Sequence, residues 1–152
     1  MRSEFDFINS LRQRVGSSSQ SIVTGIGDDA AVFRSSSGKE TVISTDLLVE
    51  DIDFRRSTTP PYLLGHKALA VSLSDLAAMG SRPLWSLISI GVPEDVWESD
   101  FIDRFYDGWL DLANRYGVQL IGGDTSRAHE HIGKSCKQRF ADAPEFCLIS
   151  CR

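Results

Sequence analysis

With 152 residues, the chain has the length of one domain, because a chain of this size can bury one hydrophobic core but not two. Hydrophobic residues make up 41% of it and charged residues 24%, a balance that excludes an extended disordered protein. The net charge of −5 disfavours nucleic-acid binding, which depends on a basic face that neutralises phosphates.

The sequence offers neither a candidate membrane span nor a secretory signal. Its apolar runs are interrupted well before the roughly 20 residues that a spanning helix needs. The opening stretch MRSEFDFINSLRQRV has no basic segment followed by an apolar one. We therefore expect a cytoplasmic protein that has no contact with a membrane.

The first part of the chain predicts a helix followed by short strands. Residues 4–15 place apolar side chains three and four positions apart after Ser3, which is a suitable N-cap. After a Ser/Gly linker, SIVTGIGDDAAVF is typical of strand, loop and strand. The stretch TVISTD then predicts a further strand with Asp46 near its end.

The second part predicts two helices alternating with two strands. Pro60 and Pro61 can open a helix that continues to Gly80, and residues 94–116 show helical spacing before Gly117. RPLWSLISIGVP and VQLIGGD predict the strands that follow each of them. We expect an α/β (α+β) fold, a mixed sheet with helices stacked against it. The buried face of the helix that ends at Gly80 is expected to consist of Leu64, Ala68, Val71, Leu76 and Met79.

Aspartates are the candidate functional residues. They occur in GIGDDA, in STD, in LSDLAAMG and in GGDTS. Carboxylates together with hydroxyl and backbone oxygens are hard ligands, which suit Mg²⁺ better than zinc or copper. Taken singly, each of these aspartates fits a turn or a helix cap better than a ligand position. The prediction is that Asp29, Asp46, Asp75 and Asp124 form one acidic cluster.

The familiar phosphate-binding loops are missing from the sequence. It has no GxxxxGK[ST] stretch, and GIGDDA lacks the third glycine of a dinucleotide-binding loop. Its acids would repel a phosphate directly, so a nucleotide would bind only through bridging divalent cations. The sequence therefore favours ATP bridged by Mg²⁺.

Four blocks, GIGDDAAVF, VISTDLLVEDIDF, HKALAVSLSDLAAMGSRP and QLIGGDTSR, together resemble the N-terminal domain of the thiamine-monophosphate kinase family, in the aminoimidazole ribonucleotide synthetase (PurM-like) superfamily. The resemblance covers about residues 1–127. It implies a mixed β-sheet covered by helices on one face and a homodimer formed through this domain. It also implies Mg²⁺-dependent transfer of the ATP γ-phosphate to thiamine monophosphate, giving thiamine diphosphate.

The resemblance also implies roles for individual residues, with no catalytic residue beyond the metal ligands. Asp53 would contact the substrate, where VEDIDF departs from the histidine of the family's usual VEGVHF. Ser72 stands where the family usually has asparagine, and its hydroxyl can still form a hydrogen bond. Tyr106 and Gly123 would line the ATP site. The implied Mg²⁺ ligands are Asp29, Ser44, Thr45, Asp46, Asp75 and Asp124, with Asp28 supporting them.

The segment 128–152 departs from the family pattern. We expect a poorly ordered tail there, a truncated chain without the family's C-terminal domain, and a dimer that survives deletion of the tail. Two alternatives remain open: a non-catalytic dimerising module that binds nucleotide or metal, and a domain with a zinc-binding tail. The zinc ligands would be His129, His131, Cys136, Cys147 and Cys151.

Overall fold

The computed structural model describes residues 3–15, 20–34, 38–128 and 145–151. Within these ranges, the side chains of Glu4, Ala128 and residues 145–151 are not described. In this part of the chain, every helix is too short or too polar to cross a membrane.

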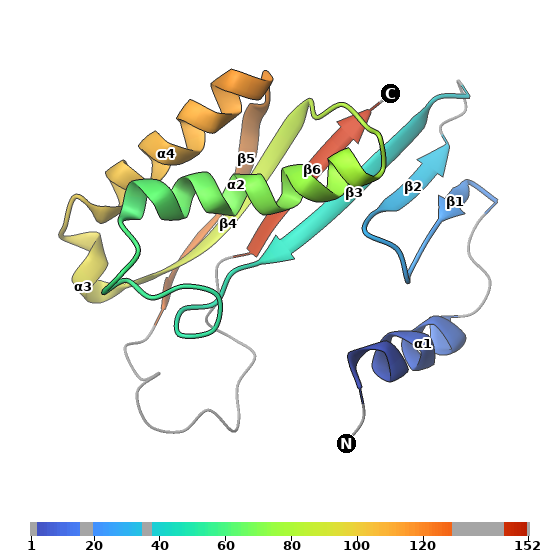
Figure 1. Cartoon of the computed structure of the whole chain (residues 1–152), viewed down its shortest axis with the longest axis horizontal. Coiled ribbons are helices and arrows are strands. Elements are labelled where there is room, and N and C mark those ends of the chain that lie inside the picture. Colours follow the sequence, from blue (N-terminus) through green and yellow to red (C-terminus); the bar gives the residue numbers. More distant parts are fainter. Residues whose placement is uncertain (1–2, 16–19, 35–37, 129–144, 152) are drawn as a thin grey trace.

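A six-stranded mixed sheet forms the centre of the fold, with the strand order β1-β2-β3-β6-β4-β5 (Figure 1). Neighbouring strands are antiparallel except β4 and β5, which are parallel. The predicted mixed sheet is therefore confirmed. The strands are β1 (Ile22–Thr24), β2 (Ala31–Arg34), β3 (Glu40–Leu47), β4 (Trp85–Pro93), β5 (Gln119–Ala128) and β6 (Glu145–Cys151).

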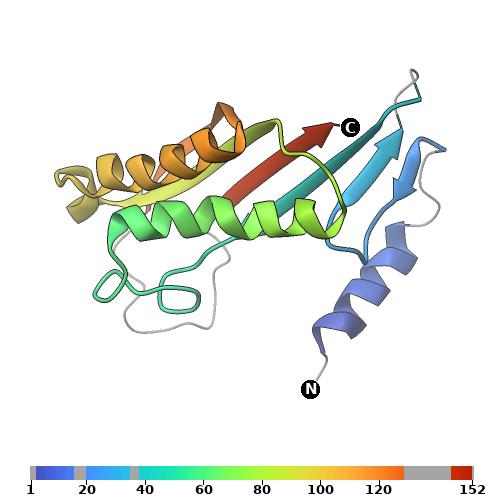
Figure 2. The same ribbon diagram turned by 45° about the horizontal axis from the view of Figure 1, so that its top comes forward.

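Two long helices, α2 (Pro61–Ala78) and α4 (Phe101–Tyr116), lie over one face of the sheet (Figures 1 and 2). This one-sided layer agrees with the expected fold class. The helix predicted over residues 94–116 is instead divided into α3 (Glu94–Trp97) and α4. Ser99 explains the break, because its hydroxyl donates to the Val96 carbonyl and accepts from the Phe101 N–H.

Glycines allow α2 and α4 to pack closely. A Cβ added at Gly65 would come within 1.8 Å of the Phe105 carbonyl oxygen, and one at Gly108 within 1.8 Å of the Tyr62 carbonyl oxygen. The Tyr62 hydroxyl also donates to Asp111 Oδ2 at 2.6 Å, which joins the two helices at the surface. This contact fixes the helical layer, in which α2 packs against β3 and β6 and α4 against β5.

The buried face of α2 agrees in part with the prediction. Leu64, Ala68 and Leu76 are buried as expected, and Gly80 ends the helix with φ of +61°. Val71 and Met79 are only half-buried. The hydrophobic pattern overlooked Leu69 and Ser72, which are fully buried because α2 is enclosed by both the sheet and α4.

The N-terminal helix α1 (Glu4–Val15) forms where the apolar spacing predicts it. It begins after Ser3, whose Oγ accepts from the Asp6 N–H at 3.2 Å while the Asp6 carboxylate accepts from Ser3. The helix lies beside the β1 edge, away from α2 and α4 (Figure 2). Its apolar side chains Phe5 and Val15 are exposed, so the helix is amphipathic without burying its apolar face in the described part of the chain.

The segment after Ala128 differs from the expected tail. Residues 145–151 form β6, which pairs with β3 on one side and β4 on the other. Without this strand, the facing backbone groups of β3 and β4 would have no neighbour, so deletion of the segment would not be harmless. The signal was present in EFCLISC, a run of apolar and aromatic residues, whereas residues 129–144 lie outside the described ranges.

Candidate magnesium and nucleotide site

Ser44 is the centre of a polar group between the sheet and α2. It lies in β3 and is buried, with its Oγ 2.5 Å from Asp75 Oδ2 and 3.4 Å from the Asp29 carbonyl oxygen. Three segments far apart in the sequence therefore meet at one hydroxyl. This group contains three of the residues that the sequence predicted as Mg²⁺ ligands.

Asp46 lies two residues further along β3, on the same face as Ser44. Its Oδ2 accepts a hydrogen bond of 2.8 Å from the Ser72 hydroxyl, so the predicted hydrogen-bonding capacity of Ser72 is confirmed. Burial raises the pKa of the Asp46 carboxyl above its ordinary value, the bond from Ser72 opposes that rise, and the charge of Asp75 adds to it. The carboxylate is thus held in a place that disfavours its charge, as expected where a cation binds.

The remaining predicted ligands of this region lie around the group. Asp28 Oδ1 accepts from the Asp29 N–H at 2.9 Å, which orders the loop between β1 and β2. Both aspartates are exposed. Thr45 falls between Ser44 and Asp46, so the alternation of the strand turns it to the opposite face.

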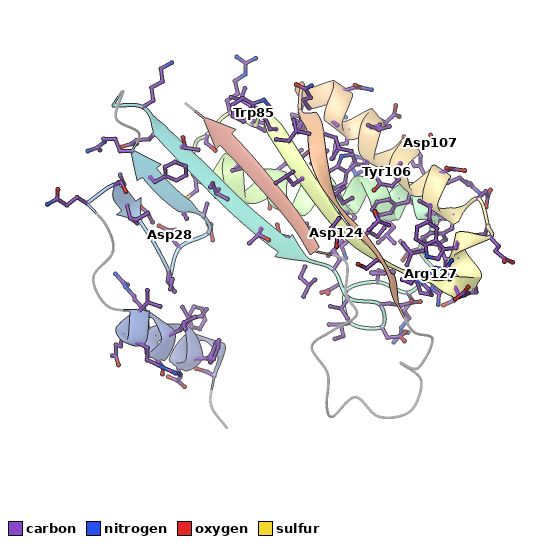
Figure 3. All side chains as sticks on the ribbon, turned by 180° about the vertical axis from the view of Figure 1, so that it is seen from behind. Asp28, Trp85, Tyr106, Asp107, Asp124 and Arg127 are labelled. Atoms are coloured by element: carbon purple, nitrogen blue, oxygen red, sulfur yellow. The ribbon has the colours of Figure 1, made fainter. Side chains whose placement is uncertain are left out.

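A second group lies on β5, at the far edge of the sheet (Figure 3). Asp124 is exposed and its Oδ2 accepts from Ser126 Oγ at 3.3 Å. A Cβ on Gly123 would come within 1.7 Å of the Ile88 carbonyl oxygen, and its φ is +151°, so only glycine fits there. Tyr106, on the adjoining helix α4, is half-buried, and burial raises the pKa of its hydroxyl.

The two groups are not joined into the single cluster that the sequence predicted. Asp46 pairs with Phe146, Phe146 with Ile88, and Ile88 with Gly123, so Asp46 and Gly123 share one row of the sheet. Three steps between strands separate them by roughly 14 Å, and Asp124 lies one residue further. Among the described residues, no three acidic, histidine or cysteine side chains stand close enough to hold one metal ion.

Asp53 is part of a tight loop that follows β3. Its Oδ2 accepts from the Val49 N–H at 2.8 Å, and its carbonyl accepts from Lys67 Nζ at 2.6 Å. Asp51 in the same loop has φ of +65°, in the left-handed region that favours glycine. The family's usual VEGVHF has glycine at this position, where Asp51 holds the left-handed backbone at some cost in strain.

Two arginines that the sequence analysis overlooked hold the surroundings of the site. Arg56 binds Glu50 at 2.8 Å and Asp95 at 2.9 Å, which ties the loop after β3 to α3. Arg127 binds Glu94 at 3.2 Å and connects β5 to the same helix. The sequence could not indicate these ion pairs, because the partners in α3 are distant along the chain. Glu94 lies 33 residues from Arg127, and Asp95 lies 39 residues from Arg56.

The donor atoms of the first group fit a magnesium ion. They are carboxylate, hydroxyl and main-chain carbonyl oxygens from Asp29, Ser44, Asp46 and Asp75, without a sulfur or imidazole donor. Hard oxygen ligands are what Mg²⁺ prefers. The zinc ligands considered for the tail are not placed: His129, His131 and Cys136 lie outside the described residues, and the side chains of Cys147 and Cys151 are not described.

The fold and these blocks define the class. The chain belongs to the family described as AIR synthase related protein, N-terminal domain, which matches residues 27–137. Within that class it is similar to the thiamine-monophosphate kinase of Bacillus subtilis, with 43% identity over 122 residues, and to that of Escherichia coli K12, with 44% over 124 residues. These matches cover 80% and 82% of this chain but 37% of each relative, so the chain spans little more than a third of their length.

Solved structures give the same relationship. A structure of AaThiL complexed with AMPPCP and TMP matches with a TM-score of 0.77 at 30% identity, over 97% of this chain and 41% of that one. The thiamine-monophosphate kinase of Stenotrophomonas maltophilia K279a matches with a TM-score of 0.63 at 34% identity, over 99% of this chain and 42% of that one. The family resemblance that the four blocks indicated is thereby confirmed.

Proposed function

We propose that this chain is the ATP- and Mg²⁺-binding domain of a thiamine-monophosphate kinase, which transfers the ATP γ-phosphate to thiamine monophosphate. One observation carries the proposal: Ser44, Asp46 and Asp75 meet between β3 and α2 in the blocks shared with the family. The proposed Mg²⁺ ligands are Asp29, Ser44, Thr45, Asp46, Asp75 and Asp124, with Asp28 in support, Tyr106 and Gly123 at the ATP and Asp53 at the substrate.

The two groups are proposed to bind different parts of the Mg²⁺–ATP complex. Asp46 and Asp75 lie on the helix-covered side of the sheet, whereas Asp124, paired with Ser89 and one residue past Gly123, belongs to the opposite face at the β5 edge. Bound Mg²⁺ would screen the repulsion between these carboxylates and the phosphates. The nucleophile, a phosphate oxygen, is already ionised near neutral pH, so the residues need to position the reactants and not to remove a proton.

Thermal unfolding with MgCl₂, with AMPPCP and with both together tests the proposal. We expect the two to raise Tm together by clearly more than the sum of their separate effects, because each would complete the other's site. Asp46→Asn should abolish this joint effect, whereas Asp51→Asn, in the neighbouring loop, should retain it. No joint effect in the wild-type chain would contradict the proposal. Incubation with ATP, Mg²⁺ and thiamine monophosphate then measures whether this chain carries the transfer itself.

A homodimer through the open face of the sheet is part of the proposal. Figure 3 looks onto the face that α2 and α4 leave uncovered, and the strands expose Leu47 (48%), Trp85 (36%) and Ile121 (51%). Exposed apolar strands invite pairing with a second copy. Light scattering should give twice the chain mass, and Trp85→Glu should shift it towards the monomer. A monomeric wild-type chain would remove the interface.

The cytoplasm remains the expected compartment of the protein.

A further inference from the structure

Two hydroxyls and two carboxylates form a reciprocal arrangement between β3 and α2. Ser44 and Asp46 are two residues apart in a strand, and Ser72 and Asp75 are three apart in a helix, so each pair shares one face of its element. Ser44 of β3 donates to Asp75 of α2, and Ser72 of α2 donates to Asp46 of β3.

Ser72 differs from the other three members, because the family resemblance assigns it no role. It is fully buried, at 0% exposure, and its Oγ lies 2.8 Å from Asp46 Oδ2. Asp46 is half-buried, and a buried hydroxyl that donates to such a carboxylate fixes its rotation. Because Oδ2 is engaged, Oδ1 is the oxygen of Asp46 that remains for a cation among the described contacts.

We propose that Ser72 is a positioning residue for magnesium binding: its hydroxyl holds Asp46 Oδ2 so that Oδ1 is presented to the ion. The inference rests on the proposed function, since it assumes that Asp46 binds Mg²⁺. Partners that orient a metal ligand commonly change metal affinity by about 10- to 100-fold when they are removed. Ser72 therefore belongs to the machinery of the site although it does not touch the metal.

The chain offers a matched control in Ser86. It is also a serine at 0% exposure, but it lies in β4, two strands away from Ser44 in the same row of the sheet, and its hydroxyl faces the Gln119 carbonyl oxygen at 3.5 Å instead of a carboxylate. Ser72→Ala and Ser86→Ala each remove one oxygen from a buried site. A general effect of losing a buried hydroxyl would appear in both variants, whereas an effect on the metal would appear in one.

Calorimetric titration of Mg²⁺ into the full chain in the presence of AMPPCP tests the inference. We expect Ser72→Ala to weaken Mg²⁺ binding by about tenfold or more, Ser86→Ala to stay within about twofold of wild type, and Ser72→Thr, which retains the hydroxyl, to recover most of the affinity. Equal Mg²⁺ affinity in wild type and Ser72→Ala would overturn the role of Ser72 and leave the proposed function standing. Absence of Mg²⁺ binding in wild type would overturn both.

Discussion

The two groups of candidate ligands differ in how much of their geometry the domain fixes by itself. Between β3 and α2, each carboxylate has a hydroxyl partner from the other element, and Ser44 and Ser72 are buried. On β5, Asp124 is exposed and its partner Ser126 belongs to the same strand. The first group is organised by tertiary packing, whereas the second is positioned only by the backbone of an edge strand.

This difference suggests a division of labour in ligand binding. Side chains that are already ordered lose little conformational entropy when a ligand binds. The group between β3 and α2 should therefore bind a cation first. The β5 side should contribute once the nucleotide is bound. The position of Asp124 depends mainly on the backbone of β5, which packs closely against β4 at Gly123.

The largest expected effect comes from Gly123→Ala. The added Cβ would lie 1.7 Å from the Ile88 carbonyl oxygen, in a residue with φ of +151°, so we expect a loss of at least about 3 kcal/mol in the free energy of unfolding. Gly122→Ala meets the strained φ alone, with its nearest contact at 3.5 Å, and should cost about 1–2 kcal/mol. Gly25→Ala has neither problem and serves as the control. Urea unfolding measures all three, and equal costs would show that β5 tolerates a side chain at Gly123.

A smaller effect of opposite sign is expected at Asp46. Burial raises the pKa of its carboxyl, so its contribution to stability is present below the unfolded value of 3.8 and is lost as pH rises through the folded value. In EDTA at neutral pH, Asp46→Asn should therefore raise Tm, and its advantage should shrink as pH falls towards 4. Asp124→Asn removes an exposed charge and should change Tm little. A Tm lowered by Asp46→Asn at neutral pH would contradict the account of that carboxylate.

Removal of Arg56, which supports the loop after β3, should destabilise the chain more than removal of Arg127, which supports β5. Arg56 binds two carboxylates with about a third of its side chain exposed, and Arg56→Ala should cost about 1 kcal/mol. Arg127 makes one ion pair between largely exposed side chains, so Arg127→Ala should cost less than about 0.5 kcal/mol. Chemical denaturation with and without about 1 M NaCl measures the loss of stability in both variants. At this salt concentration the Debye length is about 3 Å, so exposed ion pairs are screened. A larger loss for Arg127→Ala would reverse the proposed difference.

An effect as small as that of the arginines is expected in the loop after β3. Asp51 has φ of +65°, so Asp51→Gly should relieve strain and raise stability by several tenths of a kcal/mol, up to about 1. Asp51→Ala keeps the Cβ and loses the polar side chain, and it should lower stability. Thermal unfolding of both variants gives the signs, and a stabilising Asp51→Ala would show that the backbone strain is not what matters there.

The sequence predicted the parts of the fold that depend on local patterns. The strand that ends near Asp46 and the helix that carries Asp75 were predicted, because β-rich composition and a period of three to four residues are local features. The break before α4 was missed because the spacing of apolar residues continues across Ser99.

The strand order could not be predicted in the same way. Local patterns carry no record of which strand lies beside which, so the four aspartates were expected in one cluster although β5 lies at the far edge of the sheet. For the same reason β6 was taken for a tail, since its partners in β3 lie about a hundred residues earlier in the chain. The close contact at Gly65 likewise depends on where α4 comes to lie.

Paramagnetic broadening of amide NMR signals by Mn²⁺, used in place of Mg²⁺ with AMPPCP, tests the central claim most directly. If metal-bound phosphates connect the two groups, the amide signals around Ser44, Asp46 and Asp75 and those around Asp124 should broaden together, and they should do so much less in Ser72→Ala. Broadening confined to exposed acidic residues elsewhere, such as Asp100 and Asp103 at the start of α4, would contradict the account.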